Sequence, residues 1–233
     1  MECIILAGGL GTRLRSVVGD VPKCMAPVSG QPFLYYLLTY LEKQNVHHVI
    51  LSVGYKHEII VNWINTYNWS FDITFSIEDE PLGTGGAIKL ALEKSREQQV
   101  IVVNGDTFFD VDLNKLLQFH KDNNSDITIA LKSMNRFDRY GNVIIDSNKR
   151  IVSFKEKQYC EEGQINGGIY VLNSKSELMD QSWTKFSFEN EVLQKKYSVY
   201  AFYGFIQNGY FIDIGIPEDY EKADNEFKTM FLC

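Results

Sequence analysis

The sequence has little of what nucleic-acid-binding, membrane-spanning or disulfide-linked proteins need. Its 23 Lys and Arg are outnumbered by 30 Asp and Glu, a net charge of −7, so we expect no basic face for a nucleic acid. No run approaches the ~20 apolar residues of a membrane span, and the start, Met1 to Ala7, lacks the basic region of a signal peptide. The four cysteines lie far apart, without metal-binding spacing. We therefore expect a soluble cytoplasmic protein with reduced thiols that binds neither nucleic acid nor membrane.

Two common phosphate-binding motifs are also missing. No GxxxxGK[ST] sequence occurs, which argues against a P-loop NTPase. The glycine-rich run at residues 9–14, GLGTRL, ends in leucine where the dinucleotide fingerprint requires glycine or alanine. An oxidoreductase with a dinucleotide site is therefore disfavoured.

The first half of the chain alternates buried-strand runs with helical patterns. Strand-like apolar runs and helical i, i+3, i+4 patterns follow one another at residues 3–7, 33–43, 49–53, 59–67, 71–77, 87–94 and 100–103. This order predicts an α/β fold with a doubly wound, mostly parallel sheet. Ligands of such sheets bind outside the carboxyl ends of the strands, where Gly8 and Gly105-Asp106 lie.

The rhythm changes after about Asp126. Short β-type segments with little helix between them predict a small antiparallel extension that covers one side of the site. A closing strand and a helix starting at Pro217 complete the expected elements. The expected strands are residues 127–131, 141–146, 151–155, 168–172 and 210–214.

A glycine-rich turn follows the first predicted strand. Gly8, Gly9 and Gly11 let the backbone turn tightly and leave amides free to face an anion. Arg13 adds a permanent charge suited to phosphate oxygens, and Lys23, held by the preceding proline, is a candidate second cation. The alternative is a plain turn with an exposed arginine and a surface lysine. The turn with both cations favours a phosphate-binding site.

Two aspartates stand at the ends of predicted strands, Asp106 and Asp213. Carboxylates in such positions can converge on a hard cation, and Mg²⁺ commonly takes one or two of them besides phosphate oxygens and water. The alternative is that both cap turns. Asp110 and Asp112 are weaker candidates for metal binding, and Asp112 is a candidate cap for a helix that begins at Leu113.

Residues 1–32 resemble the signature of the sugar nucleotidyltransferase family, in which a stretch like LAGGxGTRL is followed by PK. Gly105-Asp106 and the run from Asp213 to Tyr220 resemble two further family motifs, whereas Cys24 stands where many members have proline. The resemblance implies a Rossmann-like sheet and transfer of a nucleoside monophosphate from an NTP to a sugar 1-phosphate, with release of pyrophosphate. The matching residues of the first segment are Leu6, Ala7, Gly8, Gly9, Gly11, Thr12, Arg13, Leu14, Pro22, Lys23, Pro27, Gly30 and Pro32.

By this resemblance, four residues would be catalytic. Arg13 and Lys23 would neutralise charge during transfer, and Asp106 and Asp213 would hold Mg²⁺. A single domain, residues 1–233, is expected, with residues 1–125 as its nucleotide-binding core and residues 126–233 as its sugar-binding portion and closing strand and helix. The implied nucleotide-binding residues are Leu6, Ala7, Gly8, Gly9, Gly11, Thr12, Arg13, Lys23, Glu80, Pro81, Gly83, Thr84, Gly105 and Asp106.

A second glycine-rich segment, residues 80–87, resembles the family segment that lies against the base, and Glu80 is a candidate acceptor for guanine. Without the family, the same segment reads as a helix start capped by Thr84.

Three later segments resemble the family's sugar-side set. Lys157 would hold the sugar's phosphate and Glu156 would bond its hydroxyls, although residues 155–157 alone read as a solvated charge run. Phe188-Glu189 resembles another recurring pair without a settled role. The implied sugar-phosphate-binding residues are Gly141, Glu156, Lys157, Asn166 and Gly168.

The sequences of residues 14–23, 81–86 and 104–107 are most similar to those of family members that join GTP to D-glycero-D-manno-heptose 1-phosphate, which implies GDP-heptose as the product. Mannose, glucose or N-acetylmuramic acid 1-phosphate with GTP, CTP or UTP is the alternative. A non-catalytic nucleotide-sugar-binding regulatory subunit is a second alternative. The 13% of aromatic residues suit either a homo-oligomer interface or a core.

Overall fold

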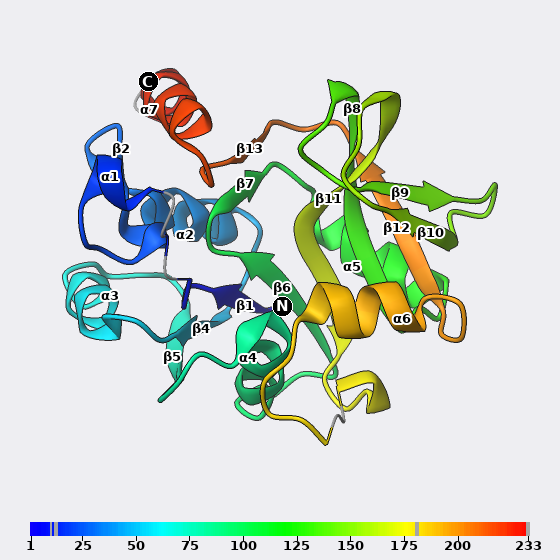
Figure 1. Cartoon of the computed structure of the whole chain (residues 1–233). Coiled ribbons are helices and arrows are strands. Elements are labelled where there is room, and N and C mark those ends of the chain that lie inside the picture. The colour runs from blue at the N-terminus through cyan, green and yellow to red at the C-terminus, as the bar shows by residue number, and fades with distance from the viewer. Residues whose placement is uncertain (10, 12–13, 180–181, 232–233) are drawn as a thin grey trace.

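A mixed sheet of nine strands organises the part of the chain that the structure describes, residues 1–9, 11, 14–179 and 182–231 (Figure 1). In this computed structural model, parallel strands form one half of the sheet, joined by crossover helices as parallel pairing requires. The strands are, in spatial order, β5 (Asp72–Ile77), β4 (His48–Val53), β1 (Glu2–Leu6) and β6 (Gln99–Asn104), and the helices are α2 (Phe33–Lys43), α3 (His57–Ile64) and α4 (Gly83–Leu92). The predicted doubly wound α/β fold is confirmed.

The antiparallel extension joins this same sheet. Its long strand β11 (Cys160–Asn173) lies antiparallel to β6, with Ile169 opposite Val103, so the sheet continues without a break past residue 126. Neither β12 nor the first half of β11 was expected from the sequence. The functional division at residue 126 stays a prediction. The other strands of this half are β8 (Ile127–Phe137), β9 (Asn142–Ile145), β10 (Ile151–Lys155) and β12 (Phe202–Gln207), and α5 (Leu113–Asp122) precedes them.

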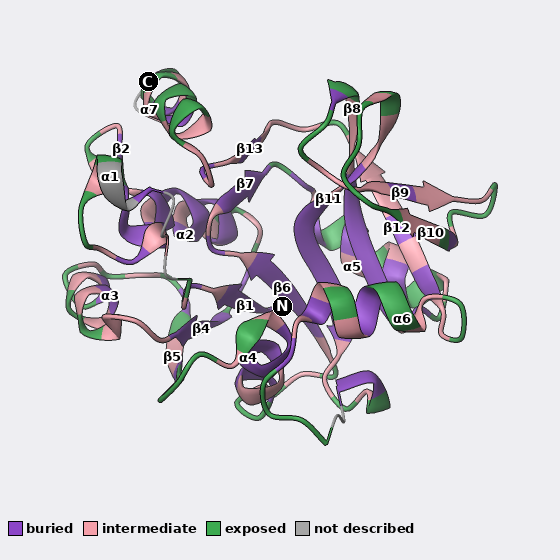
Figure 2. Ribbon diagram, in the orientation of Figure 1, coloured by how far each residue is buried: buried purple, intermediate pink, exposed green. Residues whose placement is uncertain are grey.

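Helices cover both faces of the sheet, because successive strand side chains point to opposite sides. In β1, Cys3 and Ile5 join the core under α2, α3, α5 and the C-terminal helix α7 (Pro217–Phe231), whereas Ile4 joins the core under α4. Figure 2 shows the central strands buried between these layers. No helix among the described residues combines the length and apolar character that crossing a bilayer requires.

Short elements shape the edge of the sheet where the strands end. A two-stranded ribbon, β7 (Thr107–Phe109) with β13 (Phe211–Asp213), extends beyond β6. Another ribbon pairs β2 (Pro27–Val28) with β3 (Gln31–Pro32). The remaining short helices are α1 (Arg15–Val18), η1 (Lys23–Met25), η2 (Glu177–Met179), the π-helical turn η3 (Phe188–Leu193) and α6 (Gln194–Lys196).

The structure decides two predicted helix caps. Asp112 caps α5 as predicted, since its side chain accepts a hydrogen bond from the Lys115 amide. The predicted cap by Thr84 is wrong: α4 begins at Gly83, Leu82 is its N-cap residue, and no side chain caps that end. The Thr84 hydroxyl instead contacts a distant segment.

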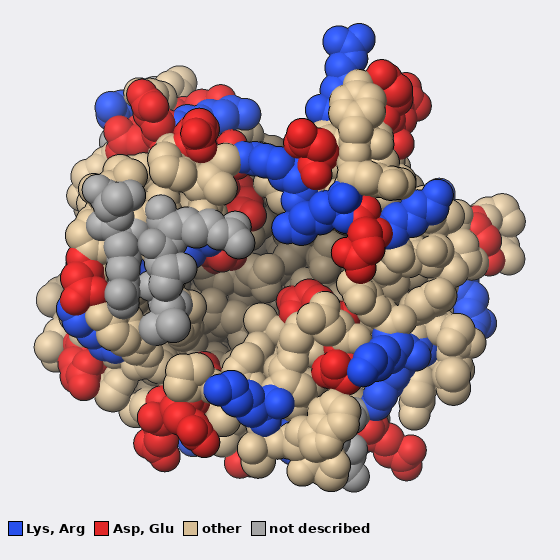
Figure 3. Space-filling model, viewed as in Figure 1, with Lys and Arg blue, Asp and Glu red and all other residues tan. Residues whose placement is uncertain are grey.

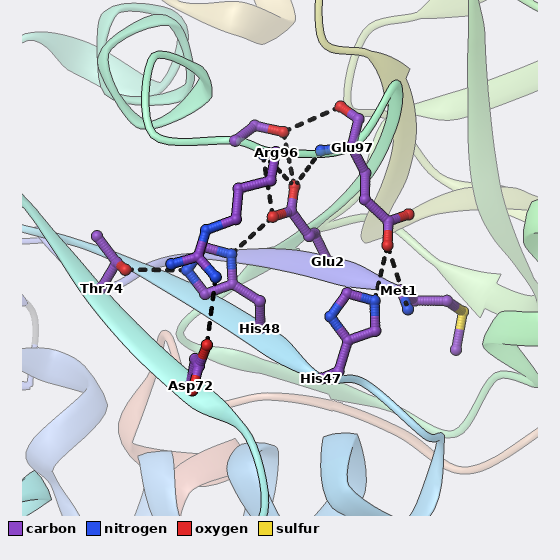
Figure 4. A network of polar contacts seen from close by, with 9 residues as sticks. Met1, Glu2, His47, His48, Asp72, Thr74, Arg96 and Glu97 are labelled. Atoms are coloured by element: carbon purple, nitrogen blue, oxygen red, sulfur yellow. Dashed lines mark hydrogen bonds and ion pairs between the residues drawn. The ribbon is translucent and has the colours of Figure 1, made fainter.

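Glu2 is the centre of a buried polar network at the end of the sheet opposite the carboxyl ends of the strands (Figure 4). Its carboxylate lies 2.7 Å from His48 Nδ1 and accepts a 2.7 Å hydrogen bond from the Ser95 hydroxyl. The backbone amides of Arg96 and Glu97 donate to it at 2.9–3.0 Å. The network therefore fastens the loop before β6 to the start of β1.

These contacts make the charge of Glu2 stabilising. Burial opposes the charged form, but the hydrogen bonds from His48, Ser95 and the two amides outweigh it and lower the pKa of Glu2 from 4.5 to about 2. Because the folded-state pKa lies below the unfolded one, the contribution is fully present above pH 4.5 and is lost as pH falls toward 2. A shift of this size corresponds to about 3 kcal/mol.

We expect Glu2→Gln to lower the free energy of unfolding by about 2–3 kcal/mol at pH 7, because the new amide cannot satisfy the same donors. Urea denaturation at several pH values measures this, and the difference from the parent protein should shrink between pH 4.5 and pH 2. Glu97→Gln is the control, since its exposed side chain pairs with His47 and the N-terminus and should cost at most about 1 kcal/mol. Equal losses in both variants would contradict this account.

Candidate active site

A cleft of about 300 Å³ opens at the carboxyl ends of the parallel strands. Figure 3 shows the viewed face hollowed near its middle, close to where β6 ends in Figure 1. This is the edge at which doubly wound sheets bind ligands. The described residues that line it are Leu6, Ala7, Gly8, Gly9, Lys23, Cys24, Ser52, Glu78, Pro81, Gly83, Thr84, Ala87, Asn104, Gly105 and Asp106.

Most of the predicted nucleotide-binding residues meet in this cleft. Gly8 and Gly9 line it directly, and Gly11, at φ +57°, packs against the Lys23 side chain. The predicted residues Thr12 and Arg13 lie outside the described residues. All the other predicted nucleotide-binding residues line the cleft except Glu80, which is exposed; Gly11 is not a lining residue either.

Backbone pairing brings the two predicted metal-binding aspartates together. In the ribbon of β13 and β7, Asp213 stands opposite Thr107, the residue after Asp106. The Ile214 amide also donates a 3.0 Å hydrogen bond to the Asp106 carbonyl. Two acids far apart in the chain are therefore held side by side, and one of them, Asp106, lines the cleft.

Lys23 lies between these two carboxylates. Its ammonium is 2.6 Å from Asp106 Oδ2 and 3.7 Å from Asp213 Oδ1. Burial raises the pKa of Asp213, and the nearby charge of Asp106 raises it further, while Lys23 acts in the opposite direction. The site thus gathers two part-exposed acids whose repulsion requires positive charge nearby.

The pair of acids suits a hard divalent cation. Carboxylate oxygens are the ligands that such ions prefer, and one or two of them suffice where substrate phosphates supply the rest. Both side chains are about one-third exposed. Asp106 lines the cleft, whereas Asp213 lines a separate hollow with Tyr140 and Asp219. The described residues hold no cluster of three or more His, Cys, Asp or Glu placed for a metal ion.

Glu78 is an acidic residue of the cleft that the sequence did not single out. It follows β5, and its carboxylate accepts a 3.0 Å hydrogen bond from the Leu82 amide and lies 3.5 Å from the Ser52 hydroxyl. Burial raises the pKa of Glu78. Its place directly after a parallel strand, like that of Gly8 after β1, is the signal that could have identified it.

The predicted sugar-side residues line a second cavity, between β9, β10 and η3. Gly141, Glu156, Lys157 and Asn166 all border it. Gly168 does not; it is buried against Asn104, and its amide donates to Asn166 Oδ1. The other described residues that line this cavity are Tyr140, Asn142, Val143, Phe154, Lys155, Glu189, Asn190, Leu193 and Gln194.

Comparison with known proteins places this architecture in a family. Residues 2–229 match the nucleotidyl transferase family. A D-glycero-alpha-D-manno-heptose 1-phosphate guanylyltransferase of Aneurinibacillus thermoaerophilus is 51% identical, over 98% of this chain and 99% of that protein. The protein of that name from Campylobacter jejuni is 50% identical, over 94% and 97%. The crystal structure of HddC from Yersinia pseudotuberculosis complexed with GMP-PN is 44% identical with a TM-score of 0.88, over 97% and 99%.

Gly105 and Gly9 offer a matched pair of substitutions at the cleft. A Cβ at Gly105 would lie 2.5 Å from the Leu6 carbonyl oxygen, a backbone atom that cannot easily move, whereas a Cβ at Gly9 meets none of the described residues within 4 Å. We expect Gly105→Ala to cost about 2–4 kcal/mol of stability and Gly9→Ala less than about 1 kcal/mol. Chemical denaturation compares the two, and a well-tolerated Gly105→Ala would refute the close approach of β1 and β6 seen here.

Proposed function

The chain belongs to the nucleotidyl transferase family, and on this premise we propose that it transfers GMP from GTP to D-glycero-α-D-manno-heptose 1-phosphate, giving GDP-heptose and pyrophosphate. The observation that carries the proposal is the convergence of Lys23, Asp106 and Asp213 beside a glycine-lined cleft. The choice of substrates follows the names of the two relatives at 50–51% identity, which this chain matches over nearly its full length.

The proposed reaction needs alignment and charge neutralisation more than proton transfer. An oxygen of the sugar's phosphate bonds to the α-phosphorus of GTP, the bond from that phosphorus to the bridging oxygen of the β-phosphate breaks, and pyrophosphate leaves. Because the nucleophile is already an anion, no strong general base is required. Lys23 would balance charge at the transferred phosphate, Arg13 would assist it from the glycine turn, and Lys157 would hold the sugar's phosphate.

Asp106 and Asp213 are the residues that would hold a divalent ion, and we propose Mg²⁺. When bound, such an ion supplies positive charge that neutralises the reacting phosphates. Lys23, in the η1 turn, is suited to balance charge beside that ion, because its ammonium already pairs with the same two acids.

Glu78 offers a physical basis for a preference for GTP. An ionised carboxylate is purely an acceptor, and guanine alone among the common bases presents two adjacent donors, N1–H and the N2 amino group. The Leu82 amide orients the carboxylate of Glu78 at the cleft wall. We therefore propose Glu78, in place of the predicted Glu80, as the acceptor for the guanine edge.

Two alternatives receive less support. A non-catalytic regulatory subunit is expected to have lost one of the charged residues, yet Lys23, Asp106 and Asp213 are present and in contact. Another nucleotide or sugar 1-phosphate remains the alternative that substrate tests decide. The cytoplasmic location and a homo-oligomeric state stay predictions.

The reaction is tested by pyrophosphate release with four NTPs crossed with heptose, mannose, glucose and N-acetylmuramic acid 1-phosphates in the presence of Mg²⁺. We expect turnover with GTP and the heptose 1-phosphate. Asp106→Asn should reduce kcat by about 10²–10³, the usual cost of losing an electrostatic group at the reacting centre. Asp110→Asn, at an exposed acid four positions on, is the control and should stay within about threefold of the parent. Full activity of Asp106→Asn would end the proposal.

Base selection is tested with Glu78→Gln. The amide keeps the shape but presents a donor toward guanine, so kcat/KM for GTP should fall by about tenfold to a hundredfold, and the preference over UTP should narrow. Glu80→Gln is the matched control and should leave both values unchanged. If Glu80→Gln lowers kcat/KM for GTP while Glu78→Gln does not, Glu80 would be the base-reading residue.

A further inference from the structure

The π-helical turn η3, which leads into α6, lines the sugar-side cavity. π-Helical turns are rare and frequently occur at functional sites. The buried side chains of Phe188, Val192 and Leu193 anchor the turn on the sheet face under α4. Of its other residues, Glu189 and Asn190 line the sugar-side cavity, and Glu191 does not.

The segment before η3 is fastened to the first turn of α4, which borders the nucleotide cleft. The Phe186 amide donates to the Leu82 carbonyl, and the Gly85 amide donates to the Phe186 carbonyl, both at 2.9 Å. The Phe188 amide then donates to the Thr84 hydroxyl, also at 2.9 Å. The start of η3 therefore has its position set by residues 82–85.

Thr84 also sets the position of the Glu189 side chain. Its hydroxyl donates a 2.6 Å hydrogen bond to Glu189 Oε2, and the Ser187 hydroxyl donates to the same oxygen at 3.0 Å. Across the described residues, no donor is recorded for Oε1, the other oxygen of this carboxylate. Glu189 is thus held by one oxygen at the wall of the sugar-side cavity, with a second acceptor left for a ligand.

We propose that Glu189 accepts a hydrogen bond from a ring hydroxyl of the sugar 1-phosphate, and that Thr84 is the positioning residue that holds it there. This inference rests on the proposed function. A carboxylate with one fixed oxygen is a pre-organised acceptor for a hydroxyl, because little side-chain freedom is lost when the ligand binds. Thr84 lines the nucleotide cleft, and its hydroxyl bonds Glu189, which lines the sugar-side cavity.

The contacts of Thr84 distinguish this role from direct nucleotide binding. Its hydroxyl already donates to Glu189 and accepts from the Phe188 amide, so its single proton is committed to the sugar side. Thr84 should therefore act on sugar binding although it lies at the nucleotide cleft. That expectation separates the proposal from a role for Thr84 as a phosphate or base contact.

Steady-state pyrophosphate release tests the proposal with Glu189→Gln, Thr84→Val, Thr84→Ser and the double variant Thr84→Val/Glu189→Gln. Each substrate is varied while the other is saturating. We expect Glu189→Gln and Thr84→Val each to lower kcat/KM for the sugar 1-phosphate by about tenfold to a hundredfold, mainly through KM, with KM for GTP within about twofold. Thr84→Ser, which keeps the hydroxyl, should restore most of the loss.

The double variant should lose no more kcat/KM for the sugar 1-phosphate than Glu189→Gln alone, because the two substitutions remove the same interaction. Glu191→Gln is the control: it lies on the same turn, pairs with Lys195 and is not among the described residues that line the cavity. Thermal unfolding checks that each variant is folded. If Thr84→Val does not fold, Thr84→Ser and Glu189→Gln still test the proposal.

A sugar KM unchanged in Glu189→Gln would overturn the proposal. A second contrary result would be a Thr84→Val variant that raises KM for GTP and whose loss of kcat/KM multiplies with that of Glu189→Gln in the double variant. The substrate preference of the parent protein distinguishes failure of this inference from failure of the proposed function. If the parent protein turns over another sugar 1-phosphate, the heptose assignment fails, while the same comparison run with that sugar still decides the role of Glu189.

Discussion

The pairing of β13 with β7 holds Asp213 beside Asp106, and two like charges in one part-buried place are stable only with positive charge between them. In the chain itself, Lys23 provides that charge from the η1 turn. The need for cations at this point makes the cleft suitable for a divalent ion and for polyphosphate chemistry. Gly8, Gly9 and Glu78 line the same cleft as Lys23 and Asp106 of this charged centre.

The sheet separates the parts of the molecule that stabilise it from the parts that would act on ligands. At one end of the strands, Glu2 and His48 form a buried network whose donors and acceptors satisfy each other. At the other end, Gly8, Glu78 and Asp106 follow their strands with polar groups facing a cleft. Loops on a rigid scaffold can carry ligand-binding groups without disturbing the core. The second cavity extends this arrangement, because η3 is hydrogen-bonded to the first turn of α4.

Local patterns were sufficient where burial has a simple period. The bounds of α2, Phe33–Lys43, agree with the helical spacing of its apolar residues, and the apolar run at residues 3–7 gave β1 within one residue. The patterns failed where long-range contacts dominate. Thr84 has the chemistry of a helix cap, yet its hydroxyl bonds Glu189. Glu80 stands beside the glycines of its segment, yet the chain turns so that Glu78 faces the cleft. β12 depends on its partner β8, which no local spacing reveals.

The sequence by itself determined the order of strands and helices in the first half of the chain, the glycine turn after the first strand, and which side chains carry charge. These follow from hydrophobic periodicity and from the chemistry of single residues, which act over a few positions. Only the tertiary structure decided that Asp106 and Asp213 share one lysine, and that Thr84 holds Glu189 at the sugar-side cavity. Such meetings depend on strand pairing and loop packing between distant segments, and their distances are fixed only when the whole sheet has formed.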